Sequence, residues 1–169
     1  ELAASPALVA LAAETPGGLD GLARIWGHLP TFLRTGRAMD RCDGTPLERK
    51  RSYGRTVGAL GRMFASSAAA LAAILAPLAP RTALDVGAGS GVWSLAVAQA
   101  VPGLQVTALD LGLDDFAERA RALSLDERVK LAPQSFHEPP LGEGCYDLVM
   151  LAAVLHLEPP DAAEALVRN

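Results

Sequence analysis

The sequence of 169 residues contains little cysteine, few aromatic residues and no apolar run long enough to cross a membrane. The two cysteines, Cys42 and Cys145, have neither the spacing of a metal site nor that of a disulfide framework, which is typical of a reducing cytoplasm. No basic segment followed by a cleavage site indicates a secretory signal. We therefore expect a cytoplasmic protein with no metal site and no membrane partner.

The sequence also lacks the excess of positive charge that general nucleic-acid binding requires, since its net charge is −4. The charge is uneven along the chain. Residues 21–65 contain nine Arg or Lys and three acidic residues, whereas residues 66–169 contain six and thirteen. We interpret the basic part as a solvated helix face, with contact to an acidic partner or an anionic substrate as the alternative.

The most informative stretch is 82–99, which predicts a buried strand, a glycine turn and the start of a helix. A short apolar run with a β-branched valine comes first, as in a parallel strand. Gly87, Gly89 and Gly91 then interrupt it, and apolar residues at helical spacing follow. Glycines at such a turn let the backbone curl tightly and let a ligand approach closely.

The spacing of these glycines bears on the kind of ligand. A dinucleotide fingerprint needs a third glycine where Val92 stands, which disfavours a nicotinamide-dependent dehydrogenase. The run here is G-x-G-x-G, with Asp85 two residues before it. The N–H groups of a helix N-terminus can bind an anion such as a phosphate or the carboxylate of an amino acid. Ordinary tight turns also use glycines, so the run alone is weak evidence.

Beyond the motif, strand and helix patterns alternate. Strands are predicted at 82–86, 104–109, 128–132 and 146–152, and helices after the glycines, at 113–125 and at 162–167. The last strand is nearly all apolar, so we expect it to be buried on both faces. This alternation predicts an α/β fold with a doubly wound parallel sheet of strand order 3-2-1-4. Ligands of such sheets bind outside the carboxyl ends of the strands.

Helices are expected before the motif. One is predicted over 2–13, and two pieces with a kink or break at Pro30 over 19–33. A long helix is expected from a capping box at 45–48 to Pro77, with one apolar stripe that includes Tyr53 and Phe64. We expect those two side chains to pack, with ligand contact as the alternative. His28 is given no role.

Asp110 ends the second strand, nineteen residues after Gly91. A carboxylate there can accept both hydroxyl groups of a ribose. The strand-Asp-x-Gly-x-Gly-x-Gly form and this acid together resemble the class I S-adenosylmethionine-dependent methyltransferases. The resemblance implies S-adenosyl-L-methionine as cofactor. It places the amino-acid end at Asp85 and the three glycines, the ribose at Asp110, and the adenine at Leu111, Ser135 and Phe136.

Val154-Leu155-His156 resembles the leucine-histidine segment of the dimeric small-molecule O-methyltransferases of plant phenylpropanoid and bacterial polyketide metabolism. The likeness implies His156 as general base, a small-molecule acceptor with a hydroxyl group, and a homodimer. It divides the chain into a partial helical dimerisation region (1–45), a linker helix (46–80) and an incomplete cofactor domain (81–169). His137 is the reserve base, and capping or packing is the alternative role of His156.

The chain departs from those families at two places. It has Leu157-Glu158 where they often have Asp-Trp, and Gln134-Ser135 where they have Gly-Asp. The second departure removes a carboxylate that would accept the adenine amino group, so Ser135 or Gln134 would replace it. Two alternatives stay open: a non-catalytic S-adenosylmethionine-binding or dimerisation module, and an N- or C-methyltransferase. We also expect the chain to be a fragment whose full-length form adds at least one strand beside the fourth.

Overall fold

A computed structural model describes residues 18–37, 57–137 and 145–168. The chain divides into two compact units, Glu1–Ala59 and Leu60–Asn169, and each is considered by itself. In the first unit, α2 (Gly18–Thr35) is one helix that continues through Pro30. Of the kink or break predicted at this proline, the break is therefore wrong. Proline has no N–H to donate to the carbonyl oxygen one turn earlier. Because Pro30 is exposed, water can donate to that oxygen instead, and the helical turns on either side persist. The predicted helix over 2–13 lies outside the described residues.

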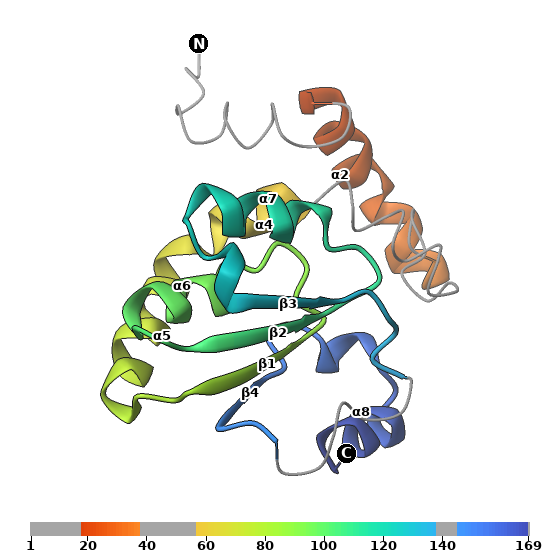
Figure 1. Ribbon diagram of the computed structural model, residues 1–169. Coiled ribbons are helices and arrows are strands. Elements are labelled where there is room, and N and C mark those ends of the chain that lie inside the picture. Colours follow the sequence, from red (N-terminus) through yellow and green to blue (C-terminus); the bar gives the residue numbers. More distant parts are fainter. Residues whose placement is uncertain (1–17, 38–56, 138–144, 169) are drawn as a thin grey trace. The chain divides into compact units, whose positions relative to one another are not determined.

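The second unit is built on a parallel sheet. Its strands are β1 (Thr82–Val86), β2 (Gln105–Leu109), β3 (Val129–Ala132) and β4 (Leu148–Met150). They lie in the order β3-β2-β1-β4, and every pairing is parallel (Figure 1). The register aligns Val86 with Leu109 and Leu109 with Ala132, so the carboxyl ends of β1, β2 and β3 lie at one level. The predicted fold class and strand order are confirmed.

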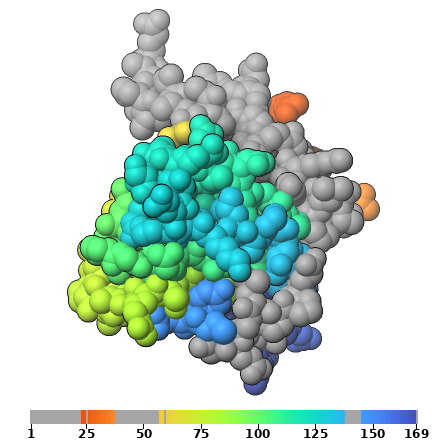
Figure 2. Space-filling view, in the orientation of Figure 1, coloured from red at the N-terminus to blue at the C-terminus, as the bar shows by residue number. Residues whose placement is uncertain are grey.

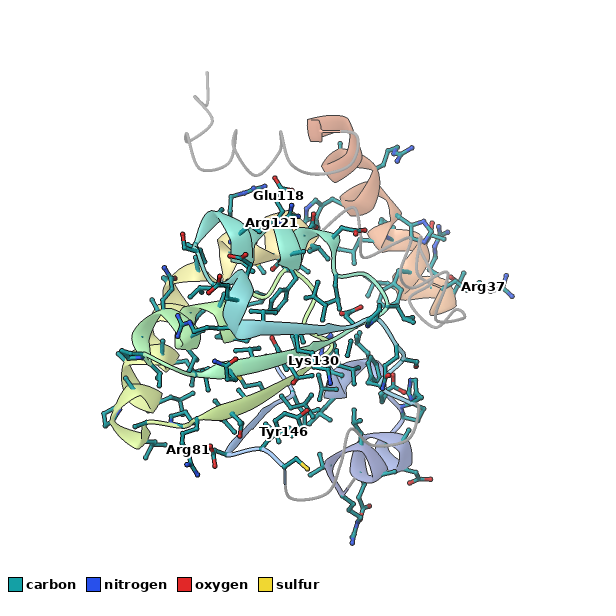
Figure 3. All side chains as sticks on the ribbon, in the orientation of Figure 1. Arg37, Arg81, Glu118, Arg121, Lys130 and Tyr146 are labelled. Carbon is teal, nitrogen blue, oxygen red and sulfur yellow. The ribbon has the colours of Figure 1, made fainter. Side chains whose placement is uncertain are left out.

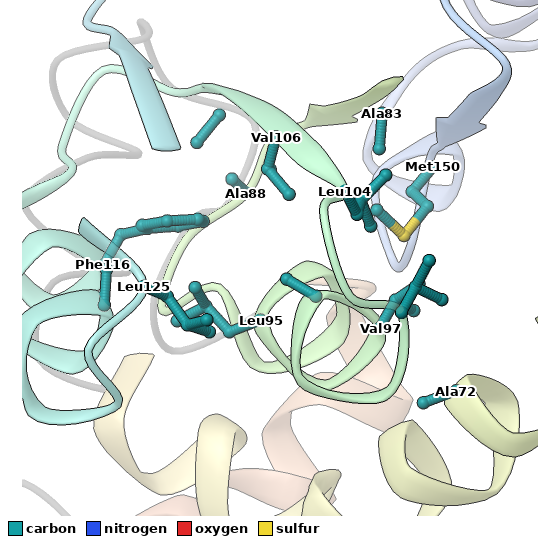
Figure 4. Packing of buried hydrophobic residues seen from close by; sticks show 14 of the residues in the cluster. Ala72, Ala83, Ala88, Leu95, Val97, Leu104, Val106, Phe116, Leu125 and Met150 are labelled. Atoms are coloured by element: carbon teal, nitrogen blue, oxygen red, sulfur yellow. The ribbon is translucent and has the colours of Figure 1, made fainter. Parts of the chain in front are cut away.

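Helices α5 (Ala65–Leu75), α6 (Val92–Ala100) and α7 (Asp114–Ala122) cover one face of this sheet (Figure 4). Two successive right-handed crossovers in the same direction place α6 and α7 on the same side. The core between sheet and helices is apolar, and Phe116, Leu104 and Val97 are its largest fully buried hydrophobic side chains. Figure 2 shows the segment from α7 to β3, in cyan to light blue, at the surface of the molecule.

The helical segment before β1 differs in part from its prediction. Its expected start at 45–48 and Tyr53 lie outside the described residues. From there on the structure has α4 (Val57–Met63), α5 and the short 3-10 helix η1 (Ala76–Leu78), which contains Pro77. α4 and α5 meet at a turn at Phe64, whose ring packs against Trp93 of α6 with centroids 5.5 Å apart. The buried residues of α5 are Ala68 and Ala72. Their small side chains let α5 approach α6 closely.

β4 is shorter than its predicted range, and the expectation that it is buried on both faces is wrong. Met150 is buried on the helix-covered face, whereas Val149 is 53% exposed. Successive residues of a strand point to opposite faces, so Val149 lies on the face away from α5–α7. β4 is an edge strand in the part of the sheet that the structure describes, and it pairs with β1 alone. It leads to η3 (Leu155–Leu157) and α8 (Pro160–Arg168).

Candidate functional site

The loop between β1 and α6, residues 87–91, is called the glycine loop. It contains three glycines with positive φ: 67° at Gly87, 52° at Gly89 and 69° at Gly91. A Cβ on Gly87 would lie 2.5 Å from Cγ2 of Val154, and one on Gly91 would lie 2.6 Å from the ring of Phe116. A Cβ on Gly89 would meet only the carbonyl oxygen of Gly87, at 3.9 Å. Two of the glycines thus allow close packing, and Gly89 leaves room above the loop for a ligand.

Backbone hydrogen bonds fix this loop to the end of β2. The N–H groups of Gly87 and Ala88 both donate to the carbonyl oxygen of Leu109, at 2.8 and 3.1 Å. The N–H of Gly91 donates to the carbonyl oxygen of Ala88 at 2.8 Å, which closes the turn before α6 begins. These three hydrogen bonds fix the backbone of the loop at Gly87, Ala88 and Gly91.

Asp110 follows β2 directly, and its carboxylate is held by two backbone amides. The N–H of Gly89 donates to Oδ2 at 3.0 Å, and the N–H of Gly112 donates to Oδ1 at 3.2 Å. A carboxylate has about four acceptor positions, so both oxygens keep capacity for further donors such as hydroxyl groups. The side chain is half-buried, as is that of Leu111 beside it. Gly89 and Asp110, each predicted from the sequence to bind the cofactor, are therefore in direct contact.

Asp85 is the last residue but one of β1, just before the loop, and its carboxyl group is almost fully buried. Burial raises the pKa of Asp85 from its usual 3.8 to about 7; the Ser94 hydroxyl lowers it and the nearby charge of Asp110 raises it further. Asp85 Oδ2 and Ser94 Oγ both lack a well-aligned hydrogen-bond partner among the described residues, so burial dominates. A ligand with a positive charge or an N–H donor would stabilise the ionised form.

The chain that leaves β4 packs on the glycine loop through Val154. Val154 is buried and is the side chain that Gly87 accommodates. His156 follows two residues later in η3, where its side chain is exposed. In the described part of the chain His156 has neither a hydrogen-bond nor an ion-pair partner. The structure thus brings the histidine segment to the glycine loop, and leaves the imidazole open to solvent.

The chain that leaves β3 holds the other predicted ligand-binding residues. Ser135 and Phe136 are half-buried. Ser135 Oγ accepts the backbone N–H of His137 at 3.2 Å, and the rings of Phe136 and His137 lie 4.6 Å apart. The imidazole of His137 lies against the carboxylate of Glu158, which follows η3, and the two form an ion pair when the imidazole is protonated.

Sequence reasoning gave no role to four residues of this region: Ser94, Phe116, Val154 and Glu158. Phe116 and Val154 belong to the core by their apolar character, but the glycines against which they pack are visible only in three dimensions. Ser94 carries a weak signal, as a polar residue in the apolar first turn after the glycines. Glu158 was noted only as a departure from a family pattern.

The described part of the chain also has a cavity that lies away from the carboxyl ends of the strands. This shallow cavity of about 200 Å³ is lined by Leu78, Pro80, Arg81 and Asp147, at the amino end of β1, and it contains none of the predicted site residues. Across the described ranges, no three His, Cys, Asp or Glu side chains are grouped as metal ligands would be. No helix in those ranges is both long and apolar enough to span a bilayer.

The residues at the carboxyl edge fit a nucleoside cofactor that ends in an amino acid. The space above Gly89 admits a ligand close to the backbone, Asp110 offers free acceptor positions, and the buried Asp85 lacks a full set of partners. A parallel doubly wound sheet binds such ligands at the point where the strand order reverses, here between β1 and β4. Fold and site together define a Rossmann-like nucleoside-cofactor domain.

The chain belongs to the methyltransferase domain family, which it matches over residues 83–169. The predicted family and the predicted cofactor, S-adenosyl-L-methionine, are thereby confirmed, and the nicotinamide-dependent alternative is set aside. No curated protein matches the chain.

Several solved structures are similar to it. A candidate O-methyltransferase from Nostoc punctiforme PCC 73102 is 29% identical with a TM-score of 0.65, over 69% of this chain and 36% of its own. The mitomycin 7-O-methyltransferase MmcR is 28% identical with a TM-score of 0.66, over 86% and 44%. Human N-acetylserotonin methyltransferase, solved in complex with SAM, shares the fold at 24% identity and a TM-score of 0.60, over 85% and 43%. The chain therefore spans less than half the length of these proteins.

Proposed function

We propose that this chain is the cofactor-binding part of a methyltransferase that transfers a methyl group from S-adenosylmethionine to a hydroxyl group of a small aromatic or polyketide-like metabolite. The observation that carries the proposal is the contact between the Gly89 N–H and the Asp110 carboxylate, beside the open space above Gly89. Family membership supports methyl transfer. The names of the similar O-methyltransferases support an oxygen acceptor.

Each predicted residue has a role in this proposal. The backbone around Gly87, Gly89 and Gly91 holds the amino-acid end of the cofactor, with the buried Asp85 carboxylate as counter-charge. Asp110 accepts the ribose hydroxyl groups on the positions that the two backbone amides leave free. Leu111, Ser135 and Phe136 border the adenine.

When bound, S-adenosylmethionine supplies a methyl group already activated by a sulfonium centre. The protein then has to align the acceptor with that group and to take up the acceptor proton. A phenol has a pKa of about 10 and an imidazole one of about 6.5, so a histidine can act as base near neutral pH. We assign this role to His156, because it lies two residues after the Val154 that packs on Gly87, and its imidazole is exposed and has no partner among the described residues.

The test is methyl transfer by the protein and by its His156→Ala variant, measured as formation of S-adenosylhomocysteine with a panel of hydroxylated aromatic acceptors. We expect the variant to lose roughly 100- to 10,000-fold in rate, the range that general base catalysis supplies. Its affinity for S-adenosylhomocysteine should stay unchanged. His28→Ala, which alters a histidine of α2, is the matched control. An unchanged rate in His156→Ala would remove the base role.

One observation favours a second candidate function. His156 has no acidic side chain to orient it among the described residues, as a non-catalytic S-adenosylmethionine-binding or dimerisation module would allow. Such a module would bind the cofactor and transfer no methyl group to any acceptor. Transfer to amines or carbon acids, but not to hydroxyl groups, would instead identify an N- or C-methyltransferase.

We further propose that the protein is a cytoplasmic homodimer. Trp26 and Leu33 on α2 are 69% and 74% exposed, which is unusual for large apolar side chains and supports an interface there. Size-exclusion chromatography with light scattering tests this proposal. A monomer at micromolar concentration would contradict it.

A further inference from the structure

Two loops at the carboxyl edge of the sheet meet at the side chains of His137 and Glu158. His137 Nε2 lies 3.4 Å from Glu158 Oε1. The Glu158 side chain is only 5% exposed, whereas that of His137 is 41% exposed. Burying a carboxylate costs free energy unless donors or cations compensate it. The imidazole is placed to provide part of this compensation from the solvent side.

The two residues follow the two outermost strands of the described sheet. His137 follows β3 and Glu158 follows β4, and β2 and β1 lie between these strands. Neighbouring strands are about 4.8 Å apart, so β3 and β4 are separated by roughly 14 Å. His137 is five residues beyond the end of β3, a length that spans at most about 17 Å. The chain after β3 and the eight residues from the end of β4 to Glu158 must therefore approach each other along the carboxyl edge of the sheet to form the pair.

Local contacts connect His137 to the residues just before it. Its backbone N–H donates to Ser135 Oγ, and its ring lies against Phe136 at an interplanar angle of 44°. A change in the position of His137 would therefore move Ser135 and Phe136 with it. The loop after β3 leaves the same edge of the sheet as Gly89 and Asp110, which follow β1 and β2.

We propose that His137 and Glu158 form a positioning pair, which ties the loop after β3 to the segment after β4 and sets the affinity for the adenosine part of the cofactor. The proposal rests on the proposed function, which places Ser135 and Phe136 at the adenine. It gives neither member of the pair a part in the methyl transfer itself.

The experiment measures binding of two probes by calorimetry, S-adenosylhomocysteine and 5′-methylthioadenosine, the second of which lacks the amino-acid end. His137→Met should weaken both probes about tenfold, the effect of losing one hydrogen bond or ion pair to a charged group. Glu158→Gln should show a similar loss, and the double variant should lose no more than either single one. His137→Lys places a cation opposite Glu158 and should stay within about threefold of the wild type.

Hydrogen exchange of the amides of residues 134–137, without any ligand, gives a second measurement. The loop should exchange about tenfold faster in His137→Met than in the wild type, because one of its attachments is lost. Lys130→Met is the matched control, since Lys130 is an exposed cation of β3 with no ion pair in the described part of the chain (Figure 3). It should change neither exchange nor binding.

Affinities of His137→Met within twofold of the wild type, or equal losses in the Met and Lys variants, would overturn the proposal. Because the His137 side chain is 41% exposed, we expect its variants to fold, so the result does not depend on the folding of Glu158→Gln. If the wild type binds neither probe, the proposed function and the role of the pair in binding are both wrong. The exchange measurement would still show whether the pair ties the loops together.

Discussion

The glycine loop after β1 and the histidine segment after β4 leave neighbouring strands at the same edge of the sheet, but they are held in different ways. Backbone hydrogen bonds attach the glycine loop to Leu109, and the N–H of Gly89 donates to the side-chain carboxylate of Asp110. The histidine segment is attached to that loop by the buried side chain of Val154, and its imidazole is exposed. A backbone scaffold for the cofactor thus lies beside a segment in which one side chain can change with little effect on folding.

The largest effect on stability should come from the buried carboxyl group of Asp85, which lies in β1 just before the glycine loop. Burial raises the pKa of Asp85 to about 7, so the folded protein favours the protonated form. The protonated Asp85 therefore stabilises the folded protein. This stabilisation is fully present below about pH 4 and is lost as the pH rises to about 7. The loss is roughly 4 kcal/mol at most.

Urea denaturation of the cofactor-free protein between pH 4.5 and 8 measures this contribution. Asp85→Asn cannot ionise, so the difference in stability between the variant and the wild type should grow with pH in favour of the variant. A difference that is constant over this range would show that Asp85 does not titrate there.

Gly91→Ala should break the scaffold itself. The new methyl group would lie 2.6 Å from the ring of Phe116, at a φ of 69° that side chains rarely adopt. We expect a loss of about 3 kcal/mol in the free energy of unfolding, from overpacking and backbone strain together. Gly103→Ala is the matched control, since φ there is 84° and no atom lies within 4 Å of the added carbon. It should cost about 1 kcal/mol. Equal losses would mean that Phe116 yields without cost.

Val154→Ala should detach the histidine segment from the loop. Removing the methyl groups that fill the space over Gly87 leaves a small cavity, with an expected cost of about 2 kcal/mol. Val167→Ala on α8 changes an exposed valine and should cost little. Chemical denaturation of both variants compares the two sites. A negligible loss in Val154→Ala would show that other contacts hold the segment.

His156→Ala should have the smallest effect on stability, within about 0.5 kcal/mol, because the side chain is exposed and unpaired in the described residues. Thermal denaturation measures it directly. A loss above 1 kcal/mol would indicate a structural role, such as capping or packing, and would weaken the assignment of His156 as base.

Local patterns in the sequence were sufficient to predict the features that the chain encodes locally. The glycine run, the strand positions and Asp110 are of this kind, because parallel strands and right-handed crossovers leave one arrangement for them. The continuity of α2 through Pro30, the exposure of Val149 and the alanine contact of α5 depend on what surrounds each residue. The His137–Glu158 pair joins two loops that follow the two outermost strands of the described sheet, and no local pattern indicates such a contact.

The central claim is that the glycine loop and Asp110 together bind S-adenosylmethionine, and calorimetry with S-adenosylhomocysteine tests it most directly. The wild-type protein should release heat on binding, and Asp110→Asn should bind at least tenfold more weakly, since it loses an ionised acceptor beside Gly89. Asp126→Asn, at an exposed carboxylate of η2 (Asp126–Arg128), should match the wild type. Absence of heat with both the methyl donor and its demethylated product, or equal affinities in wild type and Asp110→Asn, would contradict the account.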